Sequence, residues 1–90
     1  MKLHVLKIED NYYQEVRKER KKAELRKDDR DYKVGDLIHF TDTSGDEFQD
    51  NFNLYLITHI LPCRSLFESK VDYVVISITP YFASPKDGRF

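Results

Sequence analysis

Five short segments of this 90-residue chain carry β-strand patterns, whereas only one short segment has helical spacing. In the first of them, His4, Leu6 and Ile8 share one face and alternate with residues of the other face. Alternation of this kind is typical of a strand. Strands are predicted at Leu3–Ile8, Lys22–Lys27, Leu37–Thr41, Phe52–Leu61 and Val71–Thr79. The chain is therefore limited to a small, mainly β fold.

One helix is predicted between the first two strands. Asn11 can cap its start, with Gln14 reaching back three residues later, and the helix runs to about Lys18. Its apolar stripe is narrow, which indicates a surface helix that rests on the sheet by one edge. The stripe is formed by Tyr12, Tyr13 and Val16.

Five strands with one early helix favour a small mixed β-barrel over an open sandwich, so the expected class is α+β, mainly β. Phe52–Leu61 is the longest strand and is apolar on both faces, so it is expected in the centre of the sheet. Val71–Thr79 is a second candidate for a central strand. A single domain is expected over residues 1–80, with residues 81–90 as a partly ordered tail.

The length and composition point to a small cytoplasmic domain. Ninety residues allow one domain, with a compact core and no large internal cavity. The chain has no apolar run of about 18 residues, and its first ten residues are too polar for a signal peptide. Cys63 is the only cysteine, so an internal disulfide is impossible, whereas a secreted chain this small would be expected to need one.

Basic residues concentrate in one segment. Residues 17–33 hold nine of the 15 Lys and Arg but five of the 16 Asp and Glu, a local charge of +4. The remaining 73 residues hold six basic and 11 acidic residues, a charge of −5. The net charge of −1 therefore says little about nucleic acid, whereas the local pattern favours it.

The main candidate site is a constellation of Lys21, Glu24, Arg26 and Arg30. Glu24 and Arg26 lie two apart on a predicted strand, so their side chains leave the same face. Three cations and one carboxylate could line one cleft, in which Arg grips phosphate bidentately and Lys acts as a point charge. The alternative is a solvated face whose Glu–Arg pairs contribute little to stability.

Two further sets of residues could contact nucleic acid. Phosphate contacts are one interpretation of the basic run, and solubility with helix C-terminal charge is the other. The run comprises Arg17, Lys18, Arg20, Lys21 and Lys22. Tyr32, beside the basic turn, is the best candidate for stacking on a base, whereas Tyr13 and Phe40 are expected in the core.

Residues 24–36 contain a specific string, Glu-x-Arg-Lys-x-Asp-Arg-x-aromatic-x-Val-Gly-Asp. Three further segments, Leu3–Ile8, Tyr12–Val16 and Asp72–Ile78, and the residues from Lys21 to Asp36 around the string form a pattern with it. In these segments the chain resembles small bacterial and phage proteins known as domain of unknown function 3850, which are related to ASCH domains.

The resemblance implies a PUA-like β-barrel of the ASCH type that binds RNA. It also suggests that His4 points toward the cleft of Glu24 and forms a hydrogen bond there. One position departs from the family, which has Gly where this chain has Glu19. If that residue has a positive φ, Glu costs on the order of 1 kcal/mol there.

The leading hypothesis is a module that binds nucleic acid, with RNA or modified nucleotides as partner, without a cofactor and away from membranes. The rival is a small nucleoside-directed amidohydrolase of the ASCH type. In those amidohydrolases, a catalytic Lys is followed three residues later by Thr. This chain has Glu24 at that position after Lys21, so the two residues could act only as an acid–base pair. A third hypothesis is a phage-type protein-interaction factor. No metal is expected, because the spacing of His39, His59 and Cys63 is not that of a zinc site.

Overall fold

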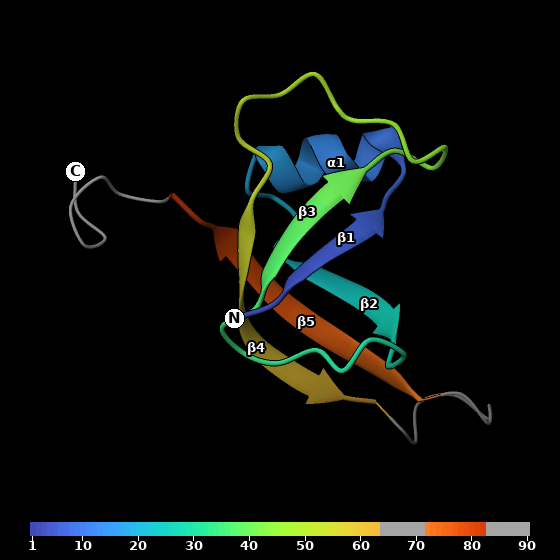
Figure 1. Ribbon diagram of the computed structural model, residues 1–90, viewed down its shortest axis with the longest axis vertical. Coiled ribbons are helices and arrows are strands. Elements are labelled where there is room, and N and C mark those ends of the chain that lie inside the picture. Colours follow the sequence, from blue (N-terminus) through green and yellow to red (C-terminus); the bar gives the residue numbers. More distant parts are fainter. Residues whose placement is uncertain (64–71, 83–90) are drawn as a thin grey trace.

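A computed structural model describes residues 1–63 and 72–82. These residues fold into one helix and five strands, as predicted (Figure 1). Cys63–Lys70 is predicted to be a connection, and its residues 64–70 lie outside the described residues, as do Val71 of the last predicted strand and residues 83–90 of the predicted tail. The elements are β1 (Leu3–Lys7), α1 (Asp10–Arg17), β2 (Ala23–Lys27), β3 (Leu37–Thr41), β4 (Tyr55–Pro62) and β5 (Tyr73–Pro80).

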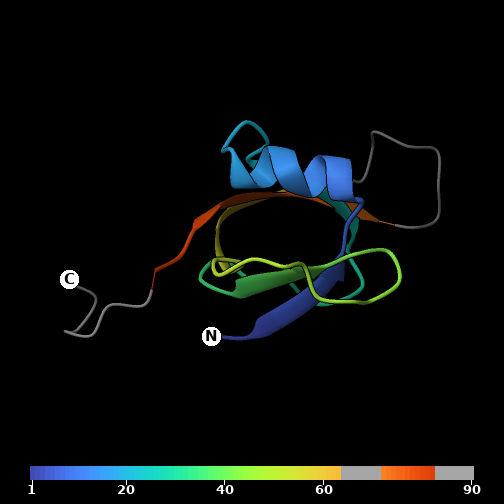
Figure 2. The same ribbon diagram turned by 90° about the horizontal axis from the view of Figure 1, so that it is seen from above.

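The five strands form one mixed sheet in the order β1-β3-β4-β5-β2. β1 and β3 are parallel, and the other pairs are antiparallel. β4 and β5 both have a neighbour on each side, which confirms their predicted central positions. The sheet curls into a half-barrel, as Figure 2 shows. A register shift between Ile57 and His59 inserts one extra residue into β4, and such a bulge increases local bending.

The core fills the concave side of the half-barrel. His4, Leu6 and Ile8, predicted to share one face, are all buried. They meet buried residues of the other strands, including Ile38, Phe40, Ile57 and Ile76. Figure 1 shows α1 lying across one end of the curled sheet, where Tyr13 and Val16 enter the core. The predicted core positions of Tyr13 and Phe40 are thus confirmed.

The helix starts earlier than predicted. Its N-cap is Glu9, not Asn11, and no side chain caps it. Gln14 instead bonds to the side chain of Asp10, at 3.3 Å. Tyr12 is half exposed and lies outside the apolar stripe, because only Tyr13 and Val16, three residues apart, face the sheet. Within the described part of the chain, α1 has eight residues, too few to cross a membrane.

The faces of β2 are the reverse of what its apolar residues suggest. Glu24 is 7% exposed, whereas Leu25 is 52% exposed and Ala23 also faces solvent. The carboxylate therefore points into the half-barrel and the leucine points out. β4 is also shorter than predicted, since it begins at Tyr55 and leaves Phe52 exposed.

The turn after α1 places Glu19 in the left-handed region, with φ of 57°. The N–H of Arg20 donates to the carbonyl of Glu15 at 2.9 Å, and the N–H of Glu19 donates to that of Val16 at 3.0 Å. This pair of bonds defines a Schellman motif, whose left-handed position is usually glycine. Glu19 therefore sits where a side chain is strained.

Glu19→Gly is expected to raise the free energy of unfolding by about 1 kcal/mol, because it removes the strain of a side chain at positive φ. Urea denaturation measures the change. The matched control is Lys18→Gly, one residue earlier at φ of −82°, which is expected to destabilise the protein. Equal effects of the two glycines would contradict the assignment.

Candidate functional site

Glu24 is a buried carboxylate that holds two cations at once. Lys21 Nζ donates to its Oε1, and Arg26 Nε donates to its Oε2 at 3.0 Å. Lys21 precedes β2, and Arg26 leaves the same face of the strand as Glu24. The structure thus brings together three of the four residues of the predicted constellation. Their combined charge is +1.

Within the part of the chain that the structure describes, the outer edge of β2 has no neighbouring strand. The Ile78 N–H donates to the Lys22 carbonyl at 2.9 Å, so the even-numbered residues of β2 pair with β5. The odd-numbered residues therefore direct their N–H and C=O groups away from the sheet. These residues are Ala23, Leu25 and Lys27.

The outer edge of β1 is open in the same way. The Ile8 N–H donates to the Thr41 carbonyl and the Leu37 N–H to the Lys2 carbonyl, so the even-numbered residues of β1 pair with β3. The carbonyls of Val5 and Lys7 therefore face away from β3. Both edges of the half-barrel thus present backbone groups that no neighbouring strand of the described residues pairs.

Two arginines connect these edges. Arg26 Nη2 donates to the Lys7 carbonyl at 2.6 Å, and Arg30 Nη1 donates to the Val5 carbonyl at 2.8 Å. We call this pair of contacts the arginine seam. Charged donors make stronger hydrogen bonds than neutral ones, so the seam holds β1 and the β2 region together without a backbone ladder. Arg30 thus belongs to the same region as Glu24, although it bonds to β1.

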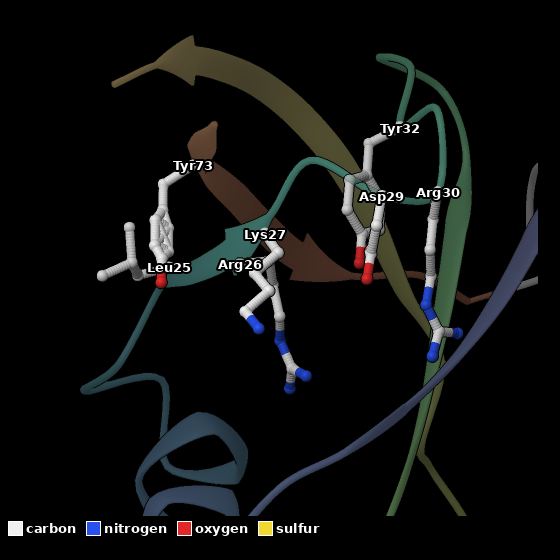
Figure 3. Close-up of a pocket in the computed structure, with 7 residues that line it drawn as sticks. All are labelled: Leu25, Arg26, Lys27, Asp29, Arg30, Tyr32 and Tyr73. Carbon is white, nitrogen blue, oxygen red and sulfur yellow. The ribbon is translucent and has the colours of Figure 1, made fainter. Parts of the chain in front are cut away.

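A hollow of ≈ 670 Å³ lies along the free edge of β2 (Figure 3). Side chains from both faces of β2 line it, so it follows the strand edge. Three of its residues are cationic and one is acidic, a charge of +2. We call it the edge hollow, and its residues are Leu25, Arg26, Lys27, Asp29, Arg30, Tyr32 and Tyr73.

His4 does not bond to Glu24, which corrects the prediction made from the resemblance. Its Nε2 lies 2.9 Å from Oδ2 of Asp36. The backbone N–H groups of Lys2 and Lys33 also donate to this carboxylate, at 3.1 and 3.2 Å. Burial raises the pKa of Asp36, but these bonds outweigh burial and hold the pKa below its usual value.

Tyr32 is more buried than a stacking residue should be. It is 8% exposed and its ring packs against His4, with centroids 4.7 Å apart. Burial raises the pKa of its hydroxyl, although Arg26 and Arg30 oppose this. Tyr32 lines the edge hollow, but it does not present the open ring face that was expected of it.

The other predicted phosphate contacts lie apart from the edge hollow. Arg17 Nε lies 2.8 Å from Oδ2 of Asp50, which also accepts a hydrogen bond from the Tyr13 hydroxyl at 2.6 Å. These bonds connect α1 to the segment between β3 and β4. Lys22 is exposed beside a smaller hollow that Glu19 and Lys21 also line. The basic run is therefore divided among several surfaces.

Four residues of the edge hollow were not predicted: Leu25, Lys27, Asp29 and Tyr73. Lys27 belongs to the basic segment, but it shares the face of Ala23 and Leu25, which the sequence pattern placed inward. Leu25 was missed because an apolar residue on a half-buried strand is expected to face inward. Tyr73 comes from β5, and no local pattern relates it to β2.

The three residues considered for zinc do not form one cluster. His39 Nδ1 bonds to the Asn53 carbonyl at 2.8 Å, and its Nε2 lies 2.7 Å from Oε1 of Glu47. His59 is exposed on β4, and Cys63 is buried. Within residues 1–63 and 72–82, no three His, Cys, Asp or Glu residues could hold a metal ion together.

Residues 3–78 match the family described as Domain of unknown function (DUF3850). The chain belongs to this family. The match runs from β1 into β5, so it includes Glu24, the arginine seam and the edge hollow. No curated protein matches the chain. The DUF3850 resemblance is thus confirmed, whereas the ASCH and PUA-like relationship stays a prediction.

Glu24→Gln is expected to lower the free energy of unfolding by about 2 kcal/mol, because Lys21 and Arg26 lose a buried partner charge. Urea denaturation measures the loss. The control is Glu15→Gln, since Glu15 pairs with Arg20 at 3.5 Å on the surface and should contribute less than about 0.5 kcal/mol. Losses of equal size in both variants would contradict the role given to Glu24.

Asp36→Asn is expected to flatten the acid limb of the stability curve. The pKa of Asp36 is lowered in the folded protein, so the unfolded chain binds the proton more readily and stability falls as the pH falls. The wild type should lose more stability than Asp36→Asn between about pH 5 and about pH 2. Urea midpoints at several pH values measure this, and parallel curves would refute it.

Proposed function

We propose that this DUF3850 chain is a small PUA-like module that binds single-stranded nucleic acid, RNA foremost, in the edge hollow. The observation that carries the proposal is the gathering of Arg26, Lys27 and Arg30 around one hollow with a single acidic residue, Asp29. Lys and Arg side chains bind nucleic acid by neutralising its phosphate groups. The lone cysteine is compatible with action in the cytoplasm.

The cations of the edge hollow retain donors for a ligand. A guanidinium group has five N–H donors, and one nitrogen of Arg30 is used by the Val5 carbonyl. Arg30 is exposed, so its other donors reach solvent. Lys27 is also exposed, and its ammonium group can act as a mobile point charge beside the arginines. A phosphate in the hollow could thus receive several charged hydrogen bonds.

Glu24 supports this proposal by holding Arg26 in place. The carboxylate does not line the edge hollow, but it fixes one side of the guanidinium while the Lys7 carbonyl fixes another. Arg26 is therefore ordered before any ligand arrives, which reduces the entropy lost on binding. Glu24 also keeps Lys21 nearby without placing a negative charge in the hollow itself.

The hydrolase and the protein-interaction factor stay alternative predictions. For a hydrolase, Lys21 and Glu24 form the required contact, but Lys21 also donates to the Ala23 carbonyl and neither residue lines the edge hollow. For a protein-interaction factor, the acidic remainder of the chain is the only argument. The cation cluster therefore supports nucleic-acid binding best.

Lys27→Gln is expected to weaken binding of a single-stranded RNA and to reduce its salt dependence by about 0.7 log units of affinity per log unit of salt, the contribution of one phosphate contact. Lys27 is replaced and not Arg26, because Arg26 is part of the arginine seam and its removal would also disturb the fold. Fluorescence anisotropy at several salt concentrations measures both effects. The control is Lys18→Gln, which removes the same charge from the end of α1, outside the hollow.

The two lysines distinguish the edge hollow from the basic run. If Lys18→Gln reduces affinity and salt dependence as much as Lys27→Gln does, general charge attraction accounts for the binding. If the wild type binds no RNA at low salt, the proposed function is wrong.

A further inference from the structure

Among the outward-facing residues of β2, Leu25 is the one for which no hydrogen bond outside the strand ladders occupies either the N–H or the C=O on the free edge. On the same edge, the Ala23 carbonyl accepts a bond from Lys21 Nζ, and the Lys27 carbonyl accepts one from the Asp29 N–H at 2.9 Å. Among the described residues, no hydrogen bond outside the strand ladders reaches the N–H or C=O of Leu25. Both groups face away from β5, toward the side where the edge hollow lies.

A single strand residue of this kind presents a donor beside an acceptor. An unpaired nucleobase offers the complementary arrangement on its Watson–Crick edge, with an acceptor beside a donor. Leu25 and Tyr73 both line the hollow, and the β2–β5 register places Tyr73 opposite Lys27, two residues from Leu25 (Figure 3). The hollow therefore has an apolar wall at the end where a base would lie.

We infer that the edge hollow binds one unpaired nucleobase, whose Watson–Crick edge pairs with the N–H and C=O of Leu25. This inference rests on the proposed function. The base lies against Leu25 and Tyr73, and its phosphate lies toward Arg26, Lys27 and Arg30. All four RNA bases have an adjacent donor and acceptor, so this contact alone discriminates weakly between them. It does require that the Watson–Crick edge of the base is not paired with another base.

An extended peptide is a poorer fit to the same edge. Strand addition uses the backbone groups of several alternate residues along an edge. Here the carbonyls of Ala23 and Lys27 are already occupied by the chain itself. Arg26 also crosses from β2 to the Lys7 carbonyl. A ligand that needs the donor and acceptor of one residue fits better than a strand.

The test compares three RNA hexamers on the wild-type protein: oligouridine, oligo-N3-methyluridine and an abasic strand. N3-methylation removes the donor of the base, and the abasic strand keeps only the backbone. Oligouridine is expected to bind about three- to tenfold more tightly than either, the effect of one or two lost hydrogen bonds. In a ¹⁵N-correlated NMR titration, the Leu25 amide signal should shift with oligouridine and stay in place with the abasic strand.

A protein-side test uses proline on the free edge. Leu25→Pro removes the N–H that faces the hollow without removing a bond to β5, and edge strands tolerate proline there. Because this variant keeps the C=O of residue 25, its preference for oligouridine should be smaller than that of the wild type but not abolished. Ala23→Pro removes an edge N–H outside the hollow and should keep the preference for oligouridine, as should Leu25→Ala, which retains the main-chain pair. If Leu25→Pro does not fold, the comparison of the three RNA hexamers on the wild-type protein still tests the inference.

The outcomes separate the two proposals. If the wild-type protein binds all three RNA hexamers with equal affinity, base pairing at Leu25 is wrong and phosphate binding is unaffected. If it binds none of the hexamers at low salt, both proposals are wrong. The inference is also wrong if the Leu25 amide signal shifts with an extended peptide but with none of the RNA hexamers.

Discussion

The structure depends on how the two outer edges of an incomplete barrel are held together. Among the described residues, the curled five-stranded sheet leaves β1 and β2 with a partner strand on one side only, and unpaired edges favour pairing with other chains. Arg26 and Arg30 donate across the gap to carbonyls of β1. The gap is thus closed by side chains, which allows a hollow along the edge that a continuous backbone ladder would fill. Glu24 balances the resulting charge from inside the half-barrel.

This closure joins stability and binding in the same residues. Arg26 contacts Glu24, the β1 edge and the hollow, so its removal would alter the fold and the site together. Lys27 lies in the same hollow but on the outer face of β2. For this reason, substitutions of exposed residues of the hollow should change ligand affinity, whereas substitutions of the inward residues of β2 should mainly change how the two edges are held together. The proposed single-stranded ligand would use an edge that the seam keeps accessible.

The strands and the helix could be predicted from local patterns, because period-two alternation and turn residues are properties of neighbouring residues. The inward face of β2 could not, since Ala23 and Leu25 made the other face look like the core side. What decides the orientation is the position of β2 at an open edge, where a carboxylate can meet Lys21 and Arg26. The partner of His4 was missed for a similar reason: Asp36 is 32 residues away. Such contacts depend on the parallel pairing of β1 and β3, which no local pattern reveals.

Asp36 explains why the segment between β2 and β3 has a fixed path. Its carboxylate binds His4 of β1, the N–H of Lys2 and the N–H of Lys33. Gly35, with φ of 96°, provides the turn that brings this carboxylate under β1. Arg30 lies in the same segment, so a fixed path for this segment helps to hold Arg30 within reach of the Val5 carbonyl. The Val34-Gly35-Asp36 stretch is therefore a structural clamp, and it supports one of the cations on which the proposed binding site depends.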